Sequence, residues 1–271
     1  TLSLHDALPI LAVALTPMFA PIAGGYLLVF FGWRAIFWTQ AAIAASVLLC
    51  MHITLRETHK PSPAATLHLG RTFQGYFSLL KDKDFAGYAL ANGFGTGALF
   101  MYIATSSHVY IDVYGLAPEM FGWLFGLASF GVIAASQIAS RLHRVYGVAR
   151  VLRASFLLKT SLAALTLILW WVNGGFLTFA IPMFFFLSFI GAIIPATSAL
   201  AMESQGHRAG LASALLGMMQ FVFGAAGAAL IGFFPGNSAL PMIAVILAFS
   251  VTGLAINLFA TRSHAHQRSP T

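Results

Sequence analysis

Residues 21–38, PIAGGYLLVFFGWRAIFW, place a proline and two glycines inside a long apolar run. Pro21 removes a backbone hydrogen-bond donor, and Gly24 and Gly25 remove side-chain bulk. Within a lipid bilayer, a helix interrupted in this way persists only where neighbouring helices cover its backbone. The stretch therefore predicts a bent transmembrane helix that packs closely against other helices.

The composition of the whole chain indicates a polytopic membrane protein. Of its 271 residues, 59% are hydrophobic and only 8% are charged, and the mean hydropathy is +0.86. A soluble domain carries about 25% charged residues, which excludes the soluble class. The net charge of +7 does not indicate a nucleic-acid partner, because the sequence has no basic stripe with interleaved aromatic residues.

The first ten residues, TLSLHDALPI, differ in kind from the rest. The chain begins at Thr1 without an initiator methionine, and this stretch has neither the basic region nor the cleavage site of a signal peptide. It resembles the in-frame translation of a common short-read sequencing adapter. We therefore expect residues 1–10 to be non-native and the native reading frame to have lost its beginning.

Uncharged runs long enough to cross a membrane recur along the chain. A helical span needs about 20 apolar residues. The runs at 160–202 and 209–261 are long enough for two spans each, and turn residues at 173–175 and 235–238 divide them. The sequence thus predicts an all-α protein with eight spans, at about 11–31, 35–55, 85–110, 120–140, 151–172, 176–202, 210–234 and 239–261.

The basic residues define an orientation for these spans. All fourteen Lys and Arg residues except Arg34 and Lys159 fall on one side of the predicted membrane. Such an excess marks the cytoplasmic side of a membrane protein. We expect the linker 56–84, the loop 203–209 and the C-terminal tail 263–271 to be cytoplasmic, together with a basic loop that contains Arg141, Arg144, Arg150 and Arg153.

The linker at 56–84 has a helical pattern of its own. Leu69, Phe73, Phe77 and Leu80 recur at helical spacing, with basic residues nearby. This pattern is typical of an amphipathic helix that lies along a membrane surface. A flexible connector is the alternative.

Several segments resemble the major facilitator superfamily, and the Bcr/CflA multidrug-efflux branch in particular. Residues 21–25, PIAGG, resemble the Pro-x-x-Gly-Gly signature of drug:proton antiporters, and the GWRAIF segment with Arg34 resembles the Bcr/CflA branch. FAGYALANGFGTGALFMYIATSS and VYGLAPEMFGWLFGL resemble the family's seventh and eighth helices, and ASRLHRVYGVARVLR resembles the basic loop after the eighth. IIPATSALAM and AGLASALLGMMQFVFGAAGAALIG resemble the tenth and eleventh helices. The resemblance implies a major facilitator fold with the last eight of twelve helices. Residues 11–55 would be the last two helices of the N-terminal six-helix bundle, and 85–262 the C-terminal bundle.

The resemblance implies a secondary active transporter whose two halves rock about a midplane site. It implies proton-coupled efflux of small amphipathic drugs by a monomer in a bacterial inner membrane. A facilitator that imports a nutrient or metabolite is the alternative, and the break at Pro21, Gly24 and Gly25 favours antiport. A non-transporting receptor or a membrane-embedded enzyme is the rival from another class. An enzyme would need paired His or acidic residues near a membrane face, and the sequence lacks them.

Two features bear on cofactors and on coupling. The single cysteine, Cys50, excludes a cysteine metal cluster, and we expect no metal and no cofactor. No Asp or Glu falls inside any of the eight predicted spans, although a carboxylate within the membrane is the natural proton carrier. We therefore expect the proton-carrying carboxylate upstream of residue 11. The 271 residues alone are not expected to transport.

Lys159 is the one charged residue well inside a predicted span. It lies nine residues beyond Arg150, which is about 13 Å along a helix. A lysine at the centre of a span costs about 2.5–3.5 kcal/mol on insertion scales. One interpretation is a cavity-facing residue that binds an anionic group or takes part in coupling. The other is a lysine whose ammonium group reaches back to the cytoplasmic interface.

Polar residues also form stripes on two other predicted spans. Such stripes face protein or water, so they line a substrate cavity or serve helix packing. The candidates are Tyr88, Asn92, Thr96 and Tyr102 of the third span and Gln220 of the seventh. Phe184, Phe185 and Phe186 are a further candidate for stacking on an aromatic drug, but we expect at least two of them to face lipid.

Overall fold

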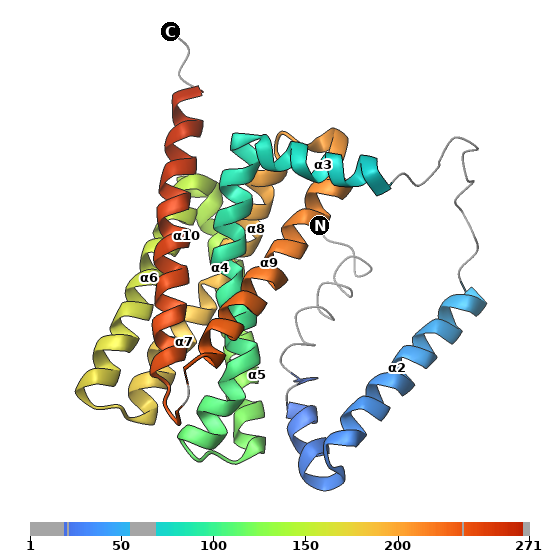
Figure 1. Cartoon of the computed structure of the whole chain (residues 1–271), viewed down its shortest axis with the longest axis vertical. Helices are drawn as coiled ribbons and strands as arrows, with labels where there is room; N and C mark the ends of the chain where they lie inside the picture. The colour runs from blue at the N-terminus through green and yellow to red at the C-terminus, as the bar shows by residue number, and fades with distance from the viewer. Residues whose placement is uncertain (1–18, 21, 55–68, 235, 268–271) are drawn as a thin grey trace. The chain divides into compact units, whose positions relative to one another are not determined.

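The computed structural model describes residues 19–20, 22–54, 69–234 and 236–267, and their regular structure is entirely helical (Figure 1). Six helices in these ranges are long and apolar enough to cross a membrane. They are α2 (Trp33–Thr54), α5 (Pro118–Tyr146), α6 (Val148–Val172), the broken helix Phe176–Met202, α9 (Ala209–Gly232) and the Leu240–Thr261 part of α10 (Leu240–Gln267). The prediction of an all-α polytopic membrane protein is confirmed.

Two of the eight predicted spans are not among these six. α4 (Lys83–Ser107) covers most of the predicted span 85–110, but polar residues and glycines occupy much of its length and make it less apolar. The predicted span 11–31 is described only as the short apolar helix Ile22–Phe31, because residues 11–18 and 21 lie outside the described residues.

The chain forms two compact units. Residues 1–73 and 117–126 make up the first, and residues 74–116 and 127–271 make up the second. In the first unit, Gly32 joins the helix Ile22–Phe31 to α2 with a φ of 77°, a left-handed conformation that glycine adopts without steric cost. Its N–H donates to the Leu28 carbonyl at 3.0 Å, which closes the end of the short helix.

The second unit is a helix bundle organised around α4. This helix packs on α8 (Ile190–Met202), α9 and α10, while α6 packs on α7 (Phe176–Ser188), α8 and α10 (Figure 1). Elements that lie far apart in the sequence therefore meet on α4. Polar side chains of α4 are thereby directed into the bundle.

Glycines on α4 let its neighbours approach closely. A Cβ at Gly93 would lie 2.6 Å from the Phe223 ring of α9, and one at Gly97 would lie 2.7 Å from the Phe223 Cβ. A Cβ at Gly95 would lie 3.1 Å from the Phe156 ring of α6. Transmembrane helices pack through such small residues because lipid offers little hydrophobic driving force for association. The Gly-x-Gly-x-Gly run thus serves packing on two faces of α4.

Asp82 begins α4 and ties it to the connection between α8 and α9. Its Oδ1 accepts hydrogen bonds from the backbone N–H groups of Asp84 at 3.1 Å and Phe85 at 3.3 Å. Its Oδ2 accepts from Gln205 Nε2 at 2.7 Å. A carboxylate at a helix N-terminus satisfies free N–H groups and complements the helix dipole. Asp82 therefore stabilises the start of α4 and also links it to Gln205.

A helix forms in the predicted linker as α3 (Leu69–Lys81). Phe77 and Leu80 are 65% and 40% exposed, whereas Leu79 is fully buried in the second unit. The predicted apolar stripe therefore points outward, which is the orientation that a helix on a membrane surface requires. Residues 55–68 of the linker lie outside the described residues.

The predicted span 176–202 is one membrane span in the structure, and it consists of two consecutive helices. α7 and α8 are separated at Phe189. Pro182 and Pro195 lie inside these helices and have no N–H, so the carbonyl four residues before each proline lacks its helical partner. For Pro195 that carbonyl belongs to Gly191.

Gly191 and Gly131 bring α5 and the α7–α8 segment into very close contact. A Cβ at Gly191 would overlap the backbone carbonyl of Val132 in α5. A Cβ at Gly131 of α5 would overlap Oγ of Ser188. Only glycine permits both approaches.

At the other end of α4 the chain continues into η1 (His108–Val113), a π-helical turn. The Tyr102 hydroxyl donates to the Tyr110 hydroxyl at 3.2 Å, and the Tyr110 ring lies 5.6 Å from the Phe179 ring of α7. Asn237 Nδ2 donates to the carbonyl of Asp112 at 3.1 Å. These contacts join the α4, α7 and α9–α10 regions at one end of the bundle.

Candidate functional site

The predicted polar stripe of α4 is buried in the bundle. Tyr88, Asn92, Thr96 and Tyr102 are each 2% exposed or less. Asn92 Oδ1 accepts a hydrogen bond from Thr197 Oγ1 of α8 at 2.8 Å, whereas its Nδ2 donor has no partner among the described residues. An unsatisfied buried donor is costly, so this amide retains capacity to bind an acceptor.

Lys159 of α6 is also fully buried. Its Nζ donates to the carbonyl of Gly95 in α4 and lies 4.9 Å from the centroid of the Phe186 ring of α7. The alternative of an ammonium at the membrane interface does not describe this arrangement, because the side chain has no exposed surface. In the described part of the chain, no carboxylate lies within salt-bridge distance of Lys159.

The two buried polar groups meet on one turn of α4. Gly95, which accepts from Lys159, is three residues from Asn92. A carbonyl and an aromatic face compensate an ammonium group only in part, since a buried cation without a counter-ion is expensive in hydrocarbon. The arrangement therefore offers a positive charge and an amide donor to an acceptor that enters the bundle beside α4.

The remaining predicted residues of the second unit lie apart from this pair. Gln220 on α9 is half-buried. Arg141 and Arg144 near the end of α5 and Arg150 near the start of α6 are exposed. Arg153 donates to Thr261 Oγ1 of α10 at 3.1 Å, which links α6 to α10.

The antiporter-motif residues belong to the first unit, and Pro21 lies outside the described residues. A Cβ at Gly25 would lie 3.1 Å from the Pro118 carbonyl oxygen, whereas a Cβ at Gly24 would meet nothing within 4 Å. The close packing expected of both glycines is thus found at Gly25. Arg34 is exposed, and its Cζ lies 4.6 Å from the centroid of the neighbouring Trp33 ring.

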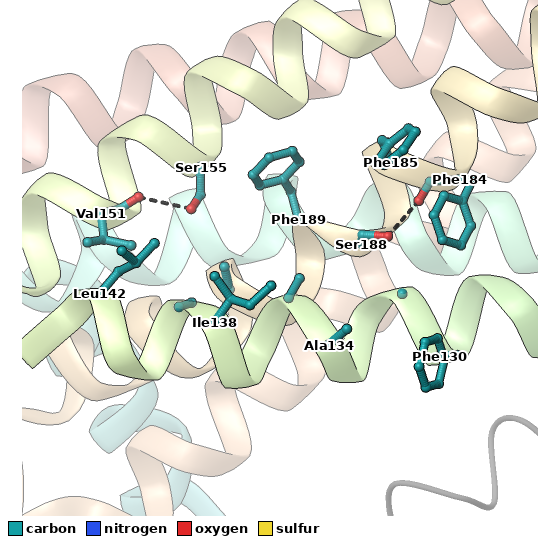
Figure 2. Close-up of a pocket in the computed structure, with 14 residues that line it drawn as sticks. Phe130, Ala134, Ile138, Leu142, Val151, Ser155, Phe184, Phe185, Ser188 and Phe189 are labelled. Carbon is teal, nitrogen blue, oxygen red and sulfur yellow. Dashed lines mark hydrogen bonds between the residues drawn. The ribbon is translucent and has the colours of Figure 1, made fainter.

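A pocket of about 330 Å³ between α5, α6, α7 and α8 was not predicted from the sequence (Figure 2). Two of its lining residues are polar, and both bond to their own helices: Ser155 donates to the Val151 carbonyl at 2.9 Å and Ser188 to the Phe184 carbonyl at 2.8 Å. The lining consists of Phe130, Gly131, Ala134, Ala135, Ile138, Ala139, Leu142, Val151, Ser155, Phe184, Phe185, Ser188, Phe189 and Ala192.

The three consecutive phenylalanines have different surroundings. Phe184 and Phe185 line the pocket, and Phe185 is 50% exposed. Phe186 is fully buried against Lys159.

Several buried polar residues were not identified from the sequence. Thr197 pairs with Asn92, and Asn257 of α10 is fully buried with no partner for either amide atom among the described residues. Asn257 is the one amide side chain in the predicted span 239–261, and this could have indicated it. The described ranges contain no group of three His, Cys, Asp or Glu residues placed to hold a metal ion.

Sequence comparison places these features in a family. The sequence model of the Major Facilitator Superfamily matches residues 10–229. The uncharacterized MFS-type transporter YdgK of Bacillus subtilis is 33% identical over 270 residues, which cover 99% of this chain and 67% of that protein. The bicyclomycin resistance protein homolog of Haemophilus influenzae is 29% identical over 258 residues, 95% of this chain and 65% of that protein. The chain therefore spans about two thirds of the length of these two relatives.

Two further comparisons concern part of the chain and its fold. The multidrug transporter MdfA of Edwardsiella piscicida is 30% identical over 131 residues, 47% of this chain and 32% of that protein. The crystal structure of a bacterial homolog of the human lysosomal transporter Spinster, inward-facing and unoccupied, matches with a TM-score of 0.62 and 17% identity, over 96% of this chain and 71% of that chain. This last likeness shows the fold alone. The family match over most of the sequence and the matching fold show that the chain belongs to the Major Facilitator Superfamily.

Proposed function

We propose that this chain is part of a Bcr/CflA-type exporter that moves small amphipathic drugs out of a bacterium in exchange for protons. The observation that carries the proposal is the pair of buried polar groups, Lys159 and Asn92, inside an otherwise apolar membrane bundle. The names of the relatives support it, since a bicyclomycin resistance homolog and a multidrug transporter are among them. The protein acts as a monomer in the inner membrane, as the resemblance implies.

The two polar groups act during alternating access. Where the two halves of a facilitator separate, helices at their interface exchange protein contacts for water and substrate. The Lys159 ammonium then exchanges the Gly95 carbonyl for an acceptor on the substrate, and the free Nδ2 of Asn92 binds a second acceptor. The predicted spans of this chain contain no carboxylate, so the proton is carried by helices of the other half.

Lys159 also favours a second candidate function, the transport of a small anionic metabolite. A cation without a carboxylate partner in the described residues is the expected complement of an acidic substrate. A cationic dye and an organic anion therefore distinguish the two functions.

Transport should be measured with a transporter of the relatives' full length, because this chain spans about two thirds of that length. Purified protein in liposomes under an imposed proton gradient is expected to move ethidium in a gradient-dependent and saturable manner. Gradient-dependent movement of an organic anion without movement of ethidium would favour the metabolite carrier. Movement of neither above protein-free vesicles would contradict both functions. The 271 residues alone should give no transport, because they span about two thirds of the length of the two relatives and their predicted spans hold no carboxylate.

The proposed orientation has its own test. In a Cys50→Ser background, single cysteines at Ser62 and at Asn173 are labelled in intact cells with an impermeant thiol reagent. We expect labelling at residue 173 and none at residue 62, because the basic loops and the C-terminal tail are proposed to be cytoplasmic. Labelling at residue 62 and none at residue 173 would show that the orientation in the membrane is the opposite of the proposed one.

A further inference from the structure

We propose that the pocket between α5, α6, α7 and α8 holds an acyl chain of an anionic phospholipid, whose phosphate binds the arginines at the α5–α6 turn. This site is separate from the buried pair formed by Lys159 and Asn92, which does not line the pocket. It goes beyond drug export and does not depend on it. Its argument rests on the chemistry of the lining, its exposure, its length and the charge at one end.

The lining suits a hydrocarbon chain rather than a drug. Drug-sized ligands are oriented by a few polar groups that converge on a pocket. The two polar lining residues, Ser155 and Ser188, already donate to carbonyls of their own helices. A hydrocarbon chain requires no such partner, and burial of its methylene groups contributes about 0.8 kcal/mol each.

The pocket opens on a surface that faces lipid in a membrane-spanning bundle. Phe130 and Ile138 of α5 are 56% and 58% exposed, and Phe185 of α7 is 50% exposed. Large apolar side chains with this exposure are stable only against an apolar solvent, which here is the bilayer. A lipid chain therefore reaches the pocket without passing through water.

The pocket forms a groove along α5 whose length is close to the thickness of one leaflet of the bilayer. Phe130, Ala134, Ile138 and Leu142 follow one another along α5 beside the pocket (Figure 2). From Phe130 to Leu142 the helix rises about 18 Å at 1.5 Å per residue. Half of a hydrocarbon core of about 30 Å is about 15 Å, so a single acyl chain lies along this length.

Arginines lie at one end of the groove. Leu142 and Val151, which line that end, directly follow Arg141 and Arg150 in the sequence. Gly147, with a φ of 82°, reverses the chain between α5 and α6 and so brings their ends together. A ligand whose chain fills the groove therefore has its headgroup at this basic turn.

These arginines are available to a phosphate. Arg141, Arg144 and Arg150 are exposed, and within the described ranges none of them forms an ion pair. Guanidinium groups bind phosphate oxygens in a bidentate manner, and basic clusters beside membrane helices attract anionic headgroups. An apolar groove that ends in unpaired arginines is complementary to an anionic phospholipid as a whole.

Lipid titration followed by native mass spectrometry tests the assignment. The purified 271-residue chain is titrated with dioleoylphosphatidylglycerol or dioleoylphosphatidylcholine, which share their acyl chains and differ in headgroup charge. We expect phosphatidylglycerol to bind at least tenfold more tightly. Equal affinities would overturn the assignment of an anionic headgroup to the arginines.

Two pairs of variants test the acyl-chain pocket and the headgroup-binding arginines separately. Ala134→Phe fills the groove and should weaken both lipids at least tenfold, whereas Gln137→Phe, at an exposed position of the same helix outside the lining, should not. Arg141→Gln with Arg144→Gln should lower affinity for phosphatidylglycerol about 30-fold and affect the zwitterionic phosphatidylcholine far less. Lys81→Gln with Lys83→Gln, which removes equal charge elsewhere, should leave the preference intact.

Retained phosphatidylcholine binding shows that the arginine variant is folded. Wild-type lipid binding by Ala134→Phe would overturn the groove assignment. Photocrosslinking places the chain directly: phosphatidylglycerol with a diazirine in its acyl chain should label residues 130–142 and 184–192. Labels confined to other helices, or a groove covered by protein in the full-length transporter, would overturn the proposal.

Discussion

One added methyl group at Gly191 is expected to destabilise the bundle by about 2–3 kcal/mol, the cost of overpacking a tight contact. A Cβ there overlaps the backbone carbonyl of Val132, and a backbone atom cannot rotate aside as a side chain does. Gly191→Ala therefore forces α5 and α8 apart. Unfolding of the purified protein in mixed detergent and dodecyl sulfate measures the loss.

Gly217→Ala is the matched control. Gly217 lies inside α9, and a Cβ there meets nothing within 4 Å. Alanine is favoured over glycine in a helix by about 0.5–1 kcal/mol, so this variant should be as stable as the wild type or more so. Equal stability of the two alanine variants would show that α5 and α8 do not touch at Gly191.

Lys159→Met is expected to reduce drug efflux at least tenfold in the restored full-length transporter without lowering its stability. Methionine keeps the unbranched stem and removes the charge. Replacing a buried ion by an apolar group of similar volume is often neutral or stabilising, so a purely structural lysine would be dispensable. A lysine that binds substrate would not be dispensable, because transport would be lost with its charge.

The experiment pairs initial transport rates with thermal unfolding. Lys81→Met is the control, because it removes an exposed charge at the start of the bundle. Full transport by Lys159→Met would contradict a substrate-binding role. Loss of stability together with transport would assign Lys159 to the fold alone.

The helices of this chain follow from its apolar runs and turn residues. The helices α9 and α10 begin at Ala209 and Leu240, next to the first residues of the predicted spans 210–234 and 239–261. The break at Phe189 was missed because Pro182 and Pro195 lie inside a run that remains apolar throughout. Hydropathy shows how long and how apolar a segment is. A helix break depends instead on missing backbone N–H groups such as those of proline, which hydropathy does not register.

The candidate site was only half visible in the sequence. The stripe with Asn92 was predicted from helical spacing, but its partner Thr197 is 105 residues away and no local pattern joins them. Hydropathy gives the depth of Lys159 along its helix and not the direction of its side chain, so the contact with Gly95 could not be predicted from the sequence. Gly24 and Gly25 differ for the same reason, since neighbours in a sequence face different sides of a helix.

The joint between α7 and α8 has a kinetic consequence. The Gly191 carbonyl faces Pro195, so the hydrogen bond that would hold a straight helix there does not exist. A change of angle here therefore has one backbone hydrogen bond fewer to break, while the Phe185 and Phe189 carbonyls still accept bonds from the N–H groups of Phe189, Ala192 and Ile193. Such a joint lowers the barrier between two conformers while leaving their relative free energies to the ligands that bind each of them.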